Sequence, residues 1–325
     1  MSRIYKCFPE SKKINFDIGV ITGVYRSGKT FAGTIVGSFN HVEHIDEPWL
    51  PWTLPVMHGR NLIATDFAKD MFRSYTEELF YELIALRQGS LKPFDLSSYW
   101  KIKTKKEILH RLKAINSRKD AEIYSNSHNS MLLYNLGGLL PFSTFINETF
   151  PKSKIVNIVR NGFHVAKAVM DKQWFSNASL KKPFDSHLFT NFIDTHGETY
   201  YLPWWVEENY EAEFLKLNDF SRGLYFWTRI LEMNNESVDK LRETNQLIDL
   251  KLEDIIEKPD KSVEILEQFF NRSRTKKTQD VISSIYNEKN ELRDFKNPHD
   301  IKKTFNVPDD IYIKSNLFLE KFNYV

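Results

Sequence analysis

One strand–loop–helix segment near the start of the sequence constrains the fold more than any other feature. Residues 16–23 (FDIGVITG) form a short apolar run that ends in glycine, which is typical of a buried strand. Residues 23–30 (GVYRSGKT) follow as a turn, and residues 31–39 have the composition of a helix. The backbone N–H groups at the start of such a helix point toward one spot, where the helix dipole adds positive potential. The segment therefore predicts an anion-binding loop.

The side chains of this loop favour a phosphate ligand. Gly28 lets the backbone approach an anion closely, and Ser27 and Thr30 add hydroxyl groups. Arg26 and Lys29 place two cations at a helix N-terminus, where the dipole disfavours them unless an anion binds. The eight residues also match G-x-x-x-x-G-K-T, the P-loop pattern of proteins that bind nucleoside triphosphates.

The rest of the chain alternates predicted strands with predicted helices, which is typical of a mainly parallel sheet covered on both faces. We predict an α/β fold with a P-loop-like parallel sheet of about five strands, flanked by helices, in a single domain over residues 1–325. Residues 174–208 have little periodicity and are predicted to form an irregular insertion on the substrate side. The further strands are predicted at residues 42–45, 154–159 and 246–252, with another beginning at 123–124, and the helices at 66–88, 103–116, from 163 onward, 221–242 and 260–270.

Composition excludes several classes of protein. Lysine and arginine number 45 and acidic residues 43, so no general nucleic-acid footprint is expected and any anion site must be local. Cys7 is the only cysteine, which excludes a disulfide within the chain and a cysteine-based metal cluster. Residues 1–13 lack the apolar core of a signal peptide, and no apolar run approaches the length that spans a bilayer. We expect a cytoplasmic protein without a transmembrane segment.

The first loop and the strand after it resemble a known family. Residues 25–30 are followed, after one helix, by residues 42–49 (VEHIDEPW). This order resembles the opening of sulfotransferases that use 3′-phosphoadenosine-5′-phosphosulfate (PAPS), whose phosphosulfate loop usually reads R/K-S-G-T-T and precedes a strand ending in Glu-Pro. Lys29 stands where the family usually has threonine. The resemblance implies that the co-substrate is bound by Tyr25, Arg26, Ser27, Gly28, Lys29, Thr30 and Phe31.

A second segment resembles the 3′-phosphate site of the same family. Residues 154–162 (KIVNIVRNG) form a strand that ends in Arg160, and such an arginine points into the crevice where α/β folds bind ligands. The family usually carries a serine eight residues after this arginine, and Ala168 occupies that position here. The resemblance implies that Arg160 and the backbone position of Ala168 face the 3′-phosphate, and His164 or Lys167 could replace the missing hydroxyl. Looser matches follow at residues 249–254 (DLKLED) and 321–324 (KFNY).

The resemblance also implies a reaction. It is in-line transfer of the sulfuryl group from PAPS to an acceptor hydroxyl or amine on a carbohydrate, with no metal required. Arg26 is the first choice for stabilising the leaving oxygen and Lys29 the second. Two residues are candidates for the base: Glu47 at the end of the second strand, and His128. We predict that the acceptor is bound by Glu47, Trp49, Trp204 and Trp205, since aromatic faces can stack on sugar rings.

Two other functions fit parts of the sequence. A P-loop kinase or NTPase that uses ATP and magnesium predicts a strand ending in aspartate, and Asp46 fits this, whereas Arg160 does not. A catalytically degenerate protein that binds a nucleotide or a glycan would explain the departures at Lys29 and Ala168. The identity of the acceptor and the oligomeric state cannot be read from the sequence.

Overall fold

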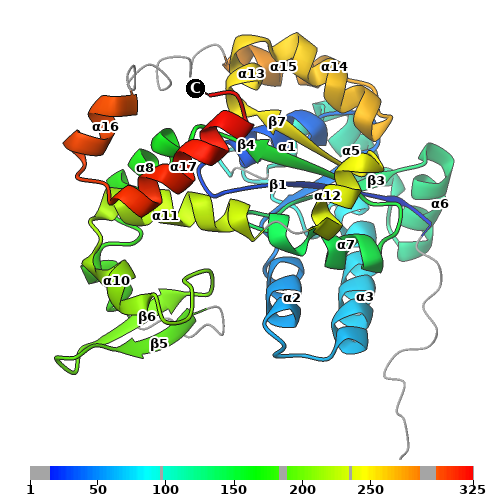
Figure 1. Cartoon of the computed structure of the whole chain (residues 1–325). Coiled ribbons are helices and arrows are strands. Elements are labelled where there is room, and N and C mark those ends of the chain that lie inside the picture. The colour runs from blue at the N-terminus through cyan, green and yellow to red at the C-terminus, as the bar shows by residue number, and fades with distance from the viewer. Residues whose placement is uncertain (1–14, 96–97, 183–188, 234–235, 286–297, 325) are drawn as a thin grey trace, which may run out of the picture.

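A computed structural model describes residues 15–95, 98–182, 189–233, 236–285 and 298–324, and its elements are shown in Figure 1. The strands are β1 (Asp17–Gly23), β2 (Val42–Asp46), β3 (Met131–Asn135), β4 (Lys154–Val159), β5 (Phe189–Ile193), β6 (Thr199–Pro203) and β7 (Leu247–Lys251). The helices of the first half are α1 (Lys29–Gly37), α2 (Trp49–Gly59), α3 (Thr65–Ile84), α4 (Tyr99–Ile102), α5 (Lys105–Ala114), α6 (Arg118–His128), the short 3-10 helix η1 (Leu140–Phe142) and α7 (Ser143–Thr149). Those of the second half are α8 (Gly162–Asp171), α9 (Asn177–Leu180), α10 (Glu211–Lys216), α11 (Asp219–Glu232), α12 (Glu236–Glu243), α13 (Leu252–Glu257), α14 (Pro259–Phe270), α15 (Lys276–Ile285), α16 (Pro298–Thr304) and α17 (Asp309–Lys321).

The main sheet has five parallel strands in the order β2-β3-β1-β4-β7. This confirms the predicted α/β fold with a parallel sheet flanked by helices. The strand β1 is central, and the chain leaves it first toward β2 on one side and later toward β4 on the other. In open α/β sheets, ligands bind beside the carboxyl ends of the strands at such a reversal of order. The loop of residues 23–30 lies at that place.

Helices cover both faces of the sheet because its strands are apolar on both sides. Ile21 of β1 belongs to one core cluster, together with residues of α1 and α14, whereas Val20 belongs to the other, together with residues of α3, α8 and α11. Figure 1 shows α13, α14 and α15 on one side of the sheet, and α2 and α3 extending from the opposite side. Alternate side chains of one strand thus pack into two separate cores.

Two predictions about elements were wrong, and one helix was not predicted. The strand expected at residues 123–124 is part of α6, and the fifth strand is β3, whose five residues are all buried. No element was predicted for residues 49–59, which form α2; Pro51 lies in its first turn, where a missing N–H costs no intrahelical bond. The single helix expected over residues 221–242 is two helices, α11 and α12.

The predicted irregular insertion contains some regular structure. Residues 174–182 and 189–208 contribute the short helix α9 and the antiparallel hairpin β5–β6. The hairpin is tied to the distal end of α2 by a hydrogen bond of 3.1 Å from Arg60 Nη2 to Thr190 Oγ1. None of the helices in the described residues is both long and apolar enough to cross a membrane.

Candidate active site

The loop between β1 and α1 has the backbone conformation of an anion cradle. Arg26 (φ 70°) and Gly28 (φ 87°) both adopt the left-handed region, and Gly28 is the N-cap of α1. A Cβ atom on Gly28 would lie 2.4 Å from Leu252 Cδ1, and one on Gly23 would lie 2.5 Å from the carbonyl oxygen of Ile158. Both residues have positive φ and no room for a Cβ atom, so these two positions require glycine.

Ser27 and Lys29 are buried within this loop. Ser27 is 1% exposed, and its Oγ atom has no hydrogen-bond partner among the described residues. A buried hydroxyl without a partner costs free energy, which a bound oxyanion would recover. Lys29 is 6% exposed, so its charge is largely removed from water as well. Both observations fit the anion-binding role predicted for the loop.

Lys29 joins the loop to the end of β2. Its Nζ atom lies 2.7 Å from Glu47 Oε1, and the Glu47 side chain is 45% exposed. Glu47 adopts the left-handed region (φ 45°), and its N–H donates to the carbonyl oxygen of Asn135 at 2.9 Å. The proposed base and one proposed catalytic cation are therefore in direct contact.

Asp46, which supports the kinase alternative, lies beside the same lysine. Its Oδ1 atom accepts a hydrogen bond from Asn135 Nδ2. Burial raises the pKa of the Asp46 carboxyl, while the positive charge of Lys29 opposes the shift and the negative charge of Glu47 adds to it. Lys29 thus faces two carboxylates at the end of β2.

Tyr25 is packed among aromatic rings behind the loop. It lies 6.1 Å from the ring of Phe226 in a stacked arrangement and 6.1 Å from the ring of Trp174, edge to face. Burial raises the pKa of the Tyr25 hydroxyl, and the Glu47 carboxylate raises it further. Tyr25 is therefore a neutral, rigid wall of the site. Phe31 of α1, also predicted to bind the co-substrate, is partly buried and packs against the core.

The segment after β3 forms a wall that the sequence analysis missed. A Cβ atom on Gly137 would lie 2.6 Å from Lys29 Cε and 2.7 Å from Tyr25 Cε1, and the Gly137 carbonyl accepts a 2.8 Å hydrogen bond from Trp52 Nε1. The glycine pair at residues 137–138 was the signal in the sequence. It was not interpreted because β3 itself was not predicted.

Arg160 lies beside the first loop, as its place at the end of β4 predicted. Its Nη1 atom donates a hydrogen bond of 2.9 Å to the carbonyl oxygen of Arg26. Arg160, which ends the second segment, therefore also stabilises the left-handed conformation of Arg26 in the first loop. The two segments that resemble phosphate sites meet at one edge of the sheet.

His164 and Lys167, the two candidates for replacing the serine hydroxyl that is missing at Ala168, point in different directions. Lys167 forms an ion pair with Asp171 at 2.6 Å on the exposed side of α8. His164 lies one helical turn before Ala168 on the same face of α8, and its Nδ1 atom is 4.0 Å from Glu253 Oε1. Of the two, His164 is the one directed toward the end of β7.

His128 does not join the site. It is the last residue of α6 and precedes β3, whereas the loop lies at the carboxyl ends of the strands. Five residues of strand separate those two edges by about 15 Å. The Nδ1 atom of His128 lies 2.8 Å from the carbonyl oxygen of Tyr124, and its ring contacts His41 at 4.6 Å. The structure therefore does not bring His128 to the loop, and of the two candidates for the base only Glu47 lies there.

The three tryptophans predicted to bind the acceptor differ in exposure. Trp49, two residues after Glu47, is 64% exposed. Trp205 is 4% exposed and lies 4.8 Å from the ring of Phe226, so it supports Tyr25 from behind and cannot contact an acceptor. Trp204 is partly buried against the ring of Phe142 at 5.1 Å. Trp174, 41% exposed beside Tyr25, is an aromatic candidate that the sequence analysis did not single out.

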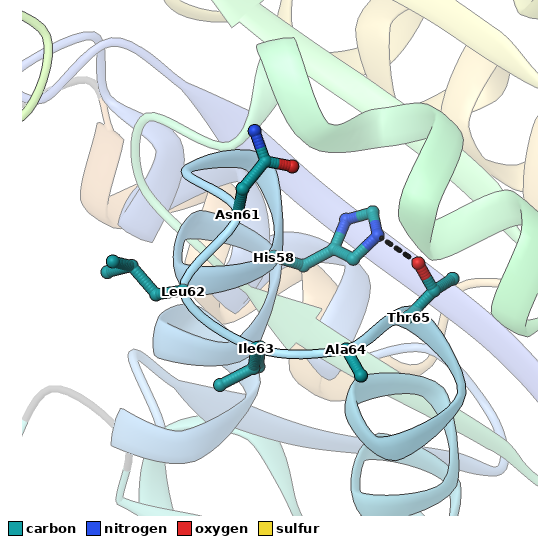
Figure 2. Close-up of a pocket in the computed structure, with 6 residues that line it drawn as sticks. All are labelled: His58, Asn61, Leu62, Ile63, Ala64 and Thr65. Carbon is teal, nitrogen blue, oxygen red and sulfur yellow. Dashed lines mark hydrogen bonds between the residues drawn. The ribbon is translucent and has the colours of Figure 1, made fainter.

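A pocket of about 350 Å³ lies elsewhere, at the turn between α2 and α3 (Figure 2). There His58 Nε2 and Thr65 Oγ1 are 3.0 Å apart. The pocket is at the far end of α2 from Trp49, about 16 Å along the helix axis. It is lined by His58, Asn61, Leu62, Ile63, Ala64 and Thr65.

Comparison with known proteins gives matches among solved structures alone: no family model matches the sequence, and no curated protein matches it. The sulfotransferase domain from the Synechococcus PCC 7002 olefin synthase shares 13% identity, with a TM-score of 0.48, and 98% of each chain is covered. The chain is similar to sulfotransferases of known structure. Sulfotransferase STF9 from Mycobacterium avium shares 9% identity, with a TM-score of 0.45 and coverage of 95% of this chain and 77% of that one. The sulfotransferase domain from the curacin biosynthetic pathway shares 13% identity, with a TM-score of 0.43 and coverage of 82% and 77%. At these identities and TM-scores the likeness says nothing about activity, which has to be argued from the residues of the site.

Proposed function

We propose that this chain is a sulfotransferase that moves the sulfuryl group of PAPS to an acceptor hydroxyl or amine. The observation that carries the proposal is the 2.9 Å hydrogen bond from Arg160 to the carbonyl oxygen of Arg26, because it joins two cationic turns at one sheet edge. A donor with phosphate groups at both the 5′ and 3′ positions needs two such anion sites side by side. ATP needs only the first.

The described residues fit this donor. The first turn of α1, the buried Ser27 hydroxyl and the glycines of the loop would hold the 5′-phosphosulfate, and Arg160 would hold the 3′-phosphate. PAPS supplies the sulfuryl group, whose bond to the 5′-phosphate oxygen breaks as the bond to the acceptor oxygen forms. The protein then has to stabilise the charge left on that phosphate oxygen and accept the acceptor's proton.

We assign these two tasks to Arg26, Lys29 and Glu47. Arg26 is exposed at the turn and Lys29 is buried in the same loop, and these two cations would stabilise the leaving oxygen. Glu47 can take the proton, since its carboxylate is near the loop and open to solvent. Because Lys29 contacts Glu47, the same ammonium group would interact both with the phosphosulfate of the donor and with the carboxylate of the base.

We further propose a carbohydrate acceptor. Trp49 follows Glu47 by two residues in sequence, and Trp174 packs on Tyr25 of the loop, and both indole rings are exposed. Flat aromatic faces beside polar groups suit the apolar faces of sugar rings. In the proposed function, residues 1–325 act as one domain in the cytoplasm.

Transfer of labelled sulfate from PAPS to a panel of oligosaccharides, phenols and aliphatic alcohols tests the proposal. We expect product with an oligosaccharide, and a higher KM for that acceptor in Trp49→Ala with unchanged affinity for the donor. Product with a phenol or an aliphatic alcohol, but with no sugar, would overturn the acceptor class and keep the enzyme class. Binding of PAPS without turnover on any acceptor would favour a degenerate binding protein.

A kinase that uses ATP and magnesium remains the second candidate, and Asp46 is the observation that favours it. Its carboxylate lies at the end of β2 beside Lys29, a place from which an acidic residue could bind a metal held by a nucleotide. Release of labelled phosphate from ATP that depends on magnesium and is lost in Asp46→Asn would support the kinase.

A further inference from the structure

The carboxylate of Glu253, at the start of α13, is held by two donors from distant parts of the chain. Its Oε1 atom accepts a 3.1 Å hydrogen bond from the backbone N–H of Asn161, and its Oε2 atom accepts a 2.7 Å hydrogen bond from Tyr324 Oη. Asn161 directly follows Arg160 and is the N-cap of α8. Glu253 therefore links Tyr324 to the turn that carries the second anion-binding arginine.

The turn after α17 positions the Tyr324 hydroxyl next to Glu253. The N–H of Tyr324 donates to the carbonyl oxygen of Leu319 at 2.8 Å, and that of Asn323 donates to Glu320 at 2.9 Å, with Asn323 in the left-handed region (φ 53°). This is a Schellman motif, which reverses the chain at the end of a helix. From the other side, Lys251 Nζ donates to the carbonyl oxygen of Asn323 at 3.1 Å and lies 4.6 Å from the centre of the Tyr324 ring.

The electrostatics of this contact suit a permanent hydrogen-bond donor. Burial raises the pKa of the Tyr324 hydroxyl, the negative charge of Glu253 raises it further, and the nearby Arg160 guanidinium opposes the shift. The phenol thus keeps its proton and donates a hydrogen bond to the carboxylate. A mobile carboxylate beside Arg160 would compete with a phosphate for that cation, whereas a carboxylate fixed by two donors cannot turn toward it.

We propose that Tyr324 is a positioning residue for the second phosphate site. It holds Glu253, Glu253 holds the N–H of Asn161, and the turn so fixed presents Arg160 to a 3′-phosphate. This inference rests on the proposed function, since it assumes a donor with a 3′-phosphate. It assigns to the region after α17 a role in donor recognition that is separate from the first loop.

The test compares two nucleotides that differ only in the 3′-phosphate. Calorimetric titration is carried out with 3′-phosphoadenosine-5′-phosphate (PAP) and with adenosine 5′-monophosphate (AMP), on wild type and Tyr324→Phe. We expect wild type to bind PAP more tightly than AMP. In Tyr324→Phe we expect the affinity for PAP to fall about tenfold, as for loss of one hydrogen bond to a charged group, with the affinity for AMP unchanged.

Two further variants make the result decisive. Glu253→Gln should show the same selective loss for PAP, which covers the case in which Tyr324→Phe fails to fold. Tyr75→Phe, on α3 and far from the site, is the matched control and should bind both nucleotides as wild type does. An equal loss for PAP and AMP would indicate a structural role only and overturn the inference, as would an unchanged affinity for PAP. If wild type itself does not prefer PAP to AMP, the proposed function fails together with the inference.

Discussion

The ammonium group of Lys29 lies 2.7 Å from the carboxylate of Glu47, and it joins the anion-binding loop to the end of β2. Lys29 is buried and Glu47 is partly exposed, so the lysine is held in place and the carboxylate faces the solvent side. In the proposed mechanism, a lysine at this position lets one cation act on both the leaving phosphate and the base. The first two predictions concern this pair.

Removal of the lysine charge should slow the chemical step. In Lys29→Ala we expect kcat for sulfuryl transfer to fall about 100-fold or more, as for loss of one preorganised donor at a developing negative charge. Steady-state kinetics with PAPS measure this. Lys69→Ala is the matched control, because Lys69 forms a similar ion pair of 2.8 Å with Glu148 on the surface. A surface pair of this kind contributes little, so the control should keep wild-type kcat.

Removal of the base should affect catalysis but not donor binding. In Glu47→Gln we expect kcat to fall about 100-fold or more, while the dissociation constant for PAP stays within a few-fold of wild type. Glu148→Gln serves as the control. A Glu47→Gln variant with normal kcat would show that another group accepts the proton.

The conformation of the loop should depend on Gly28. A Cβ atom there meets Leu252 at 2.4 Å in a left-handed backbone, so Gly28→Ala should abolish measurable binding of PAP. Gly197 has a similar φ of 80° but nothing within 4 Å of its added Cβ. Gly197→Ala should therefore cost about 1 kcal/mol in the free energy of unfolding, from backbone strain alone, and leave binding unchanged. Equal binding by the two variants would contradict the close-packed cradle.

The stability of the protein should depend on pH through His44. This residue of β2 is fully buried against Gly33 and Gly37 of α1, and burial lowers the pKa of its imidazole from 6.5 to about 3. The unfolded chain therefore binds a proton more readily, and the folded protein loses stability as the pH falls from 6.5 toward 3. Between pH 7 and pH 5 this contribution is about 2 kcal/mol in the free energy of unfolding.

Urea unfolding at the two pH values measures the effect. His44→Gln should lose less stability between pH 7 and pH 5 than wild type does, by about that amount. His58→Gln, which keeps His44, should show the wild-type dependence. A His44→Gln variant with the full wild-type dependence would assign the effect to other groups.

The sequence was enough to predict the parallel sheet and the first loop, because both depend on local patterns. The apolar run at residues 16–23 and the glycine-rich turn after it define a strand–turn–helix segment without reference to the rest of the chain. The place of Arg160 followed from the same reasoning, since the carboxyl ends of parallel strands meet at one edge.

Contacts between distant segments could not be predicted. The strand β3 is short and follows a helix without a clear break, so the wall formed by Gly137 was missed. Without β3, the position of His128 relative to the sheet could not be predicted. The burial of Trp205 depends on Phe226 of α11, and the hydrogen bond from Tyr324 to Glu253 joins residues 71 positions apart. Only the assembled fold brings these groups together.

The central claim is a site for two phosphate groups, and one titration tests it most directly. Purified wild type and Arg160→Ala are titrated by calorimetry with PAP and, in parallel, with ATP and magnesium. We predict tight binding of PAP by wild type, a large loss of that affinity in Arg160→Ala, and weaker binding of ATP with magnesium. Tighter binding of ATP with magnesium than of PAP, unaffected by Arg160→Ala, would contradict the sulfotransferase assignment and favour the kinase.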